Sequence, residues 1–178
     1  MPDSFTFVGA VLVAGAFGWA ALSKLVGYER WRRALAGYKL PGTFERAARL
    51  GTPVMEAFVV VVVLFGPLPL AGALTLALLA GFCVVVVRAR AVQGDRLPCG
   101  CFGGATERDY RLMLVRNTVL AVPAGALVLS GDPGLIDRIA SIEGSEILPL
   151  GLVLMAGGLV VWVTMGLLEL QSGKGENR

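Results

Sequence analysis

The sequence predicts an all-α integral membrane protein, with a bundle of four transmembrane helices and a fifth transmembrane helix on its C-terminal side. Hydrophobic residues make up 56% of the 178 residues and charged residues only 16%, and the mean hydropathy is +0.73. An ordinary soluble domain is about a quarter charged. The apolar residues form long segments that approach or exceed the roughly 20 residues that a spanning helix needs. Because lipid offers the backbone no hydrogen bonds, even the valine-rich segments are expected to be helices.

The predicted spans, in chain order, are residues 5–26, 51–66, 69–90, 112–130 and 147–169. The second span is the shortest, and the sequence PLPL that follows it predicts a tight turn between antiparallel helices. Small residues recur at helical spacing in the first and last spans, which favours close helix packing. We expect a four-helix domain over 1–130, a loop and fifth span over 131–170, and a disordered tail over 171–178.

Positive charge is distributed unevenly between the two faces of the predicted bundle. Of the 16 Lys and Arg residues, all but Arg138 lie in segments that a five-span chain places on one face. The positive-inside rule then predicts an outside N-terminus, with the first connection, the loop at 96–104 and the C-terminus in the cytoplasm of a bacterial-type cell. Topology therefore accounts for the net charge of +3. The expected partner is the lipid bilayer and not a nucleic acid.

Four polar residues near the same membrane face are candidates for a functional site. Lys24 ends the first span, Glu56 lies about one turn inside the second, and Arg116 and Asn117 open the fourth. An ionisable residue inside a span marks a functional position by default. Glu56 has two interpretations: a salt bridge to Lys24 or Arg116 that packs helices, or a proton relay for a redox pair. Arg116 and Asn117 are candidates for holding a quinone head group. For Lys24, the alternative to a functional role is that its side chain reaches to the membrane–water interface.

The sequence RLPCGCFGG, residues 96–104, places Cys99 and Cys101 one residue apart in a polar loop. Gly100 between them lacks the Cβ that would resist the bend needed for a disulfide, and Pro98 stiffens the entry to the loop. So small a disulfide ring is expected to be strained and easily reduced. The pair is therefore the predicted catalytic centre of thiol–disulfide exchange.

Two other interpretations of the loop cysteines stay open. The chain has no histidine, which excludes Ser-His and Cys-His catalysis, and two thiolates alone do not make a four-ligand zinc site. A soft Cu(I) ion can take two sulfur ligands, and the cysteines can also be purely structural. We predict no metal. Cys83, in an apolar segment, is expected to behave as a small hydrophobic residue.

Three segments together resemble the DoxX/MauE family of membrane proteins. They are ALSKLVGYERWRRALAGYKLP (21–41), PVMEAFVVVVVL (53–64), and RLPCGCFGG followed by LMLVRN (112–117). The third is close to the pattern of the MauE branch, and the likeness extends over about residues 5–130. It implies a four-helix membrane bundle associated with thiol redox chemistry. For the MauE branch it implies a part in maturing the disulfide-rich small subunit of periplasmic methylamine dehydrogenase.

The resemblance also implies which residues form the family motif. Carried over by position, they are Lys24, Glu56, Cys99, Cys101, Phe102, Gly103, Arg116 and Asn117. The chain departs from the family pattern in two ways, namely the fifth span at 147–169 and a charge distribution that places the cysteine loop in the cytoplasm. The second departure conflicts with a substrate that is handled directly in the periplasm.

The leading functional hypothesis is a membrane thiol–disulfide redox protein that exchanges electrons with a thioredoxin-like partner or a quinone. No other cofactor is predicted, and the sequence does not decide whether the protein is an enzyme. The alternative is a non-enzymatic assembly factor that docks a maturing redox enzyme through the basic segment 27–50. A third hypothesis is a small transporter or metal chaperone that uses Cys99, Cys101 and Glu56.

Overall fold

The computed structural model describes residues 3–98, 107–131 and 133–140. The chain divides into two compact units, 1–138 and 139–178, and the described residues lie almost entirely in the first. The predicted fifth span at 147–169 and the tail at 171–178 are outside the described residues. Those two elements, and the domain boundary expected at residue 130, therefore stay predictions.

The first unit is all-α, with four helices long and apolar enough to cross a membrane. They are α1 (Asp3–Val26), α3 (Gly42–Phe65), α4 (Leu68–Gln93) and α5 (Tyr110–Val128). The shorter elements are α2 (Tyr28–Gly37), β1 (Arg96–Pro98), β2 (Glu107–Asp109) and α6 (Leu135–Ala140). The prediction of four membrane helices is thereby confirmed, and the chain is a multi-pass membrane protein.

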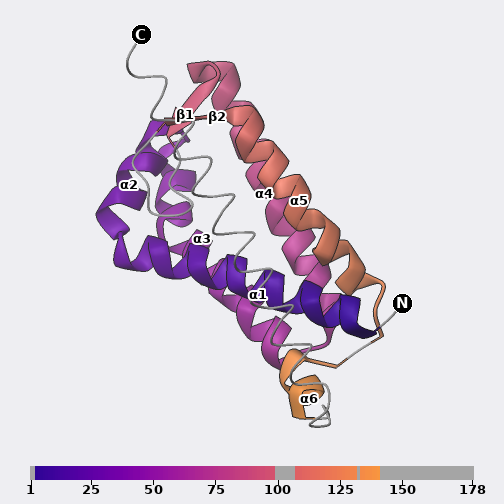
Figure 1. Cartoon of the computed structure of the whole chain (residues 1–178). Coiled ribbons are helices and arrows are strands. Elements are labelled where there is room, and N and C mark those ends of the chain that lie inside the picture. Colours follow the sequence, from indigo (N-terminus) through magenta and orange to yellow (C-terminus); the bar gives the residue numbers. More distant parts are fainter. Residues whose placement is uncertain (1–2, 99–106, 132, 141–178) are drawn as a thin grey trace, which may run out of the picture. The chain divides into compact units, whose positions relative to one another are not determined.

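The four long helices form a closed ring of neighbours (Figure 1). Helix α1 packs against α3 and α5, and α4 packs against α3 and α5. The end of α1, the start of α3, the end of α4 and the start of α5 lie at one end of this bundle. Helix α2 and the two short strands lie at that end as well, because α2 contacts both α3 and β1. We call this the hairpin end of the bundle.

A glycine separates α1 from α2. A Cβ placed on Gly27 would lie 2.8 Å from the carbonyl oxygen of Ser23, closer than a side chain tolerates. The amide of Gly27 donates to that same oxygen, and the amide of Trp31 donates to the carbonyl of Gly27. The chain therefore passes directly from the membrane helix into α2, which covers the hairpin end.

The expected start of the second span, residue 51, is wrong, because α3 begins nine residues earlier at Gly42. Pro41 precedes the helix in an extended conformation, with φ −53° and ψ 138°, which suits the residue before a first helical turn. The sequence Gly51-Thr52-Pro53 looks like a helix boundary, yet Pro53 lies inside the helix and is buried. Much of the segment 27–50 is thus helical, in α2 and in the first turns of α3.

The expected polar loop after the third span is flanked by a two-stranded antiparallel ribbon. Arg96 pairs with Asp109, Leu97 with Arg108, and Pro98 with Glu107. Asp109 is also the N-cap of α5, and its carboxylate accepts a hydrogen bond from the amide of Arg111 at 2.8 Å. Strand β2 therefore passes into α5 without a linker.

Candidate functional site

A buried ion pair joins α1 to α3. The ammonium nitrogen of Lys24 lies 2.6 Å and 2.8 Å from the two carboxylate oxygens of Glu56, and both side chains are almost fully buried, at 1% and 3% exposed. The ammonium also donates to the carbonyl of Ala20 at 3.4 Å. Lys24 and Arg116 were the two partners expected for Glu56, and the structure shows the ion pair with Lys24. Lys24 does not extend to the interface.

Trp31 of α2 covers the ion pair on one side. The Lys24 ammonium lies 5.3 Å from the centroid of the Trp31 ring, within the range of a cation–π interaction. Three hydrogen bonds and the face of the ring together replace the hydration that the Lys24 ammonium loses on burial. Charges away from water are tolerated only when they are paired and hydrogen-bonded in this way.

The indole of Trp31 also bonds a carbonyl that Pro53 leaves without a helical donor. In an α-helix each amide donates to the carbonyl four residues earlier, and proline has no amide hydrogen. Pro53 therefore cannot bond the carbonyl of Arg49, and the Nε1–H of Trp31 donates to that oxygen at 3.0 Å. The Trp31 side chain thus contacts the ion pair and also satisfies the hydrogen bond that the backbone of α3 lacks at Arg49.

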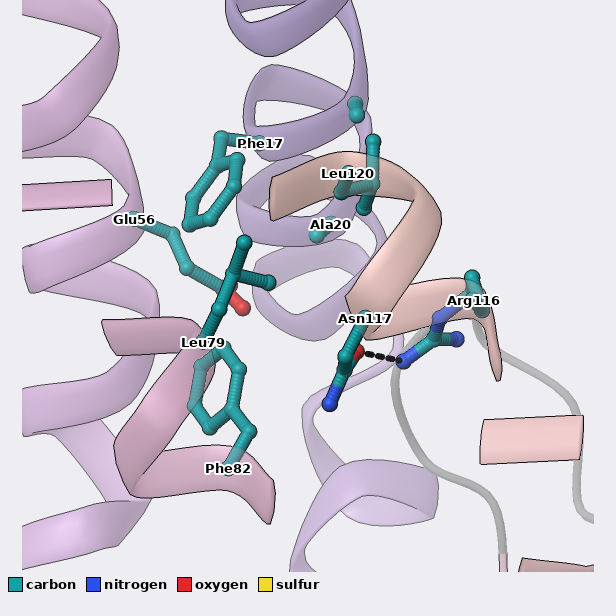
Figure 2. Close-up of a pocket in the computed structure, with 9 residues that line it drawn as sticks. Phe17, Ala20, Glu56, Leu79, Phe82, Arg116, Asn117 and Leu120 are labelled. Carbon is teal, nitrogen blue, oxygen red and sulfur yellow. Dashed lines mark hydrogen bonds between the residues drawn. The ribbon is translucent and has the colours of Figure 1, made fainter. Parts of the chain in front are cut away.

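A small cavity of about 20 Å³ lies beside the ion pair, large enough for about one water molecule. Glu56 reaches it from α3, and Arg116 and Asn117 reach it from α5 on the opposite side (Figure 2). The remaining lining residues are Ala16, Phe17, Ala20, Leu79, Phe82 and Leu120. All four membrane helices thus contribute to one site that is largely apolar, with an acidic, a basic and an amide side chain.

A chain of weak polar contacts leads from the cavity into α4. The Nη2 of Arg116 donates to the Oδ1 of Asn117 at 3.4 Å, and the Nδ2 of Asn117 donates to the Sγ of Cys83 at 3.6 Å. Cys83 thus contacts a polar amide from a neighbouring helix, which the apolar sequence around it does not indicate. No sequence signal finds this contact, because it depends on how α4 and α5 are rotated about their axes.

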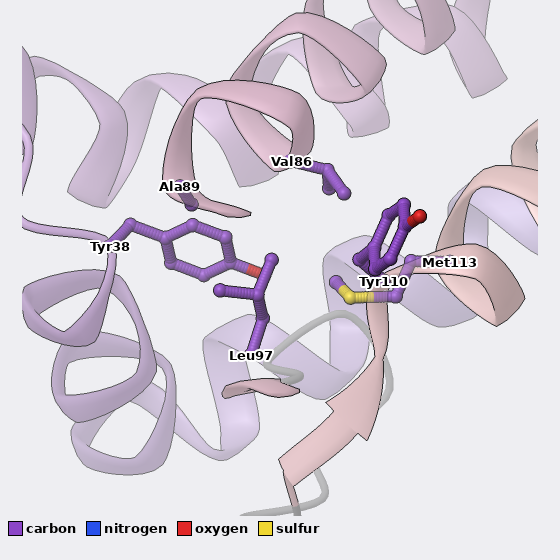
Figure 3. Close-up of a cluster of buried hydrophobic side chains, with 6 residues drawn as sticks. All are labelled: Tyr38, Val86, Ala89, Leu97, Tyr110 and Met113. Carbon is purple, nitrogen blue, oxygen red and sulfur yellow. The ribbon is translucent and has the colours of Figure 1, made fainter. Parts of the chain in front are cut away.

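A hydrophobic cluster at the hairpin end fixes the strands to the helices (Figure 3). Its buried members are Tyr38, Val86, Ala89, Leu97, Tyr110 and Met113. Arg90 closes one side, since its guanidinium lies 4.1 Å from the centroid of the Tyr110 ring and its Nε lies 2.9 Å from a carboxylate oxygen of Asp95. Leu97, fully buried, packs in this cluster with Tyr38, which follows α2, and with Tyr110 at the start of α5.

The structure brings four of the predicted site residues into one region: Lys24, Glu56, Arg116 and Asn117. Pro98 ends β1, where it pairs with Glu107. Cys99, Gly100, Cys101, Phe102 and Gly103 are outside the described residues, so their predicted roles are untested. Within the described part of the chain, no group of three Cys, Asp or Glu side chains is arranged to hold a metal ion.

Four apolar helices, a buried ion pair between two of them and a hairpin at one end define the chain as a polytopic membrane protein with an intramembrane polar site. A family model described as "Methylamine utilisation protein MauE" matches residues 2–130. The chain belongs to this family, which confirms the resemblance seen in the sequence.

One relative shows the extent of the similarity. The methylamine utilization protein MauE of Paracoccus denitrificans is 30% identical over 165 residues, which cover 89% of this chain and 83% of the relative. No solved structure matches the chain significantly. The likeness extends beyond residue 130 and therefore beyond the four described membrane helices.

Proposed function

We propose that this chain is a membrane thiol–disulfide exchange protein in which Cys99 and Cys101 are the redox pair. The observation that carries the proposal is the pairing of Pro98 with Glu107, which closes the connecting segment 99–106 at its base. A catalytic thiol must be accessible and held near a rigid scaffold. Cys99 follows directly after a residue of the anchored strand, and Leu97 of that strand is fully buried.

The proposed reaction consists of two thiolate displacements that balance without another reagent. The thiolate of one loop cysteine attacks a partner disulfide, forms a mixed disulfide and releases one partner thiolate. The second loop cysteine then attacks the mixed disulfide, which releases the partner as a dithiol and leaves Cys99 and Cys101 oxidised. Run in reverse, the same steps oxidise a partner dithiol. A thioredoxin-like protein or a quinone exchanges the two electrons and two protons that reset the pair.

Membership of the MauE family supports a role in maturing a partner protein of methylamine utilisation. The named relative is described as a methylamine utilization protein, and the proposal extends methylamine utilisation to this chain; the maturation step is what the family resemblance implies. For Lys24 and Glu56 we propose a packing role, because both carboxylate oxygens are taken up by the ammonium. Arg116 and Asn117, which face the cavity across from Glu56, are the residues proposed to contact a small polar ligand there.

Trapping of the mixed disulfide tests the proposal. Cys99→Ser and Cys101→Ser are each made in the full chain. Only the variant that keeps the attacking thiol should accumulate a mixed disulfide with the partner protein. Non-reducing electrophoresis and mass spectrometry detect that adduct. Cys83→Ser is the matched control, because it removes the thiol that lies within α4, and it should leave the adduct and the cellular thiol state unchanged.

Two results would count against the exchange reaction. One is the absence of any trapped partner together with an unchanged thiol state in the Cys99→Ser/Cys101→Ser double variant. The other is full complementation of a deletion strain by that double variant. Complementation without the cysteines is the outcome that the alternative hypothesis, a non-enzymatic assembly factor, requires. A membrane-impermeant thiol reagent applied to intact cells would also report which side holds the pair.

A further inference from the structure

The orientation of α2 is fixed by its buried face. Trp31, Ala34 and Leu35 are buried, and Tyr38, which follows the helix, is buried as well. These positions follow the i, i+3, i+4, i+7 spacing of one helix face. Because this face packs on the protein and not on lipid, the opposite face of α2 must point outward from the hairpin end.

Exposed basic residues occur on α2 and on the segment that follows it. We call these residues the basic face and define it as Arg30, Arg32, Arg33, Lys39 and Arg46. All five residues are exposed. The two acidic side chains of the segment 27–50 are already engaged, since Glu29 pairs with Arg32 at 2.8 Å and Glu45 pairs with Arg49 at 2.6 Å. Among the described residues, none of the salt bridges includes Arg30, Arg33, Lys39 or Arg46.

Exposed apolar side chains adjoin the basic face in the sequence. Phe44, between Lys39 and Arg46, is 69% exposed, and Val26, at the end of α1, is 77% exposed. In a membrane protein such side chains are covered by acyl chains or by the interfacial region. A ligand that satisfies both kinds of side chain has a negative head and an apolar tail.

We infer that the basic face binds the head groups of anionic phospholipids, with Phe44 and Val26 against the adjoining acyl chains. Basic residues next to a membrane helix each contribute about 1 kcal/mol of attraction to an anionic surface, or roughly fivefold in affinity. An acidic soluble protein would match the charges but not the exposed apolar residues beside them. The inference is independent of the thiol chemistry, and its failure would leave that proposal unaffected.

The test is a titration of the purified full-length protein in neutral detergent with dioleoylphosphatidylglycerol, with dioleoylphosphatidylcholine as the uncharged comparison. Binding is read from lipid adducts in native mass spectrometry and from the shift in the unfolding temperature. The variant Arg30→Gln/Arg33→Gln is compared with Arg88→Gln/Arg96→Gln, which removes the same charge from exposed positions outside the basic face.

The wild-type chain should prefer phosphatidylglycerol. The α2 variant should lose about 25-fold in affinity for it, the product of two fivefold factors, and the control variant less than threefold. All three chains should unfold at the same temperature in phosphatidylcholine, because the substituted residues are exposed. Equal loss in both variants would show that binding follows total charge, and would overturn the inference. Unchanged lipid binding by the α2 variant, with lost complementation in cells, would also overturn it and indicate a protein partner.

Discussion

The contact between α1 and α3 and the contact between α4 and α5 hold the same bundle together by different means. The first is fixed by charge, because Lys24 and Glu56 meet between the helices. The second is fixed by shape. A Cβ on Gly72 of α4 would lie 2.6 Å from the carbonyl oxygen of Ala124 and 2.7 Å from the amide nitrogen of Val128, both in α5. In lipid, small residues and interhelical polar contacts are the two main means by which helices associate.

The two contacts tolerate different kinds of substitution. A charge contact fails when either partner is removed, yet it can be replaced by two apolar residues of similar volume. A shape contact fails when one carbon atom is added at the glycine. Because the clash is with backbone atoms of the facing helix, no substitution of a side chain there relieves it. Glu56→Ala and Gly72→Ala test this distinction, and Trp31→Phe tests the indole that covers the charge contact.

Removal of one charge should have the largest effect. Glu56→Ala leaves the Lys24 ammonium buried without its counter-charge, and we expect a loss of about 3–5 kcal/mol in the free energy of unfolding. The double variant Lys24→Met/Glu56→Leu should recover most of that loss. Unfolding by sodium dodecyl sulfate, followed by circular dichroism, measures both. A double variant as unstable as the single one would show that the pair does more than balance charge.

Addition of one carbon at the shape contact should come second. Gly72→Ala must move the α5 backbone, and overpacking of this kind costs about 1–3 kcal/mol. Gly81→Ala in the same helix is the control, since a Cβ there meets nothing within 4 Å, and it should be neutral or slightly stabilising because alanine favours helix over glycine. The same unfolding measurement applies. Equal effects at both positions would contradict the close contact.

Loss of the indole hydrogen bond should have the smallest effect. Trp31→Phe keeps an aromatic ring near Lys24 but removes the donor to the Arg49 carbonyl, at a cost of about 0.5–1.5 kcal/mol. In a Pro53→Ala background residue 53 regains an amide hydrogen for that carbonyl, so the same substitution should cost less. A double-mutant cycle measures the coupling. Additive effects would mean that the indole and the proline act independently.

The sequence alone was enough to predict the four membrane helices, because their hydropathy depends only on local composition. It also placed Lys24, Glu56 and Arg116 at one end of the bundle, since chain direction alternates from span to span. It did not decide which cation pairs with Glu56. That choice depends on the rotation of each helix about its axis, which apolar segments with little amphipathic pattern leave undefined.

The start of α3 and the two-stranded ribbon were not predicted, for local reasons. The early start of α3 was hidden by Gly51 and Pro53, which ordinarily indicate a helix boundary; here the Trp31 indole, 18 residues earlier in the chain, replaces the missing donor. The ribbon of β1 and β2 has three residues per strand. Strands this short show no alternation that a sequence pattern can reveal, and Leu97 is the single buried apolar residue among those whose burial is described there.

Under the proposed exchange reaction, the closed base of the hairpin limits where a partner protein can react. Chain geometry allows at most about 3.6 Å per residue, so Cys101, three residues after the paired Pro98, stays within roughly 11 Å of it. Covalent geometry alone therefore keeps both thiols near the hairpin end of the bundle. In the proposed exchange reaction, a client protein must therefore bring its own sulfur atoms to the hairpin end of the bundle, which favours clients whose cysteines lie on extended or unfinished segments.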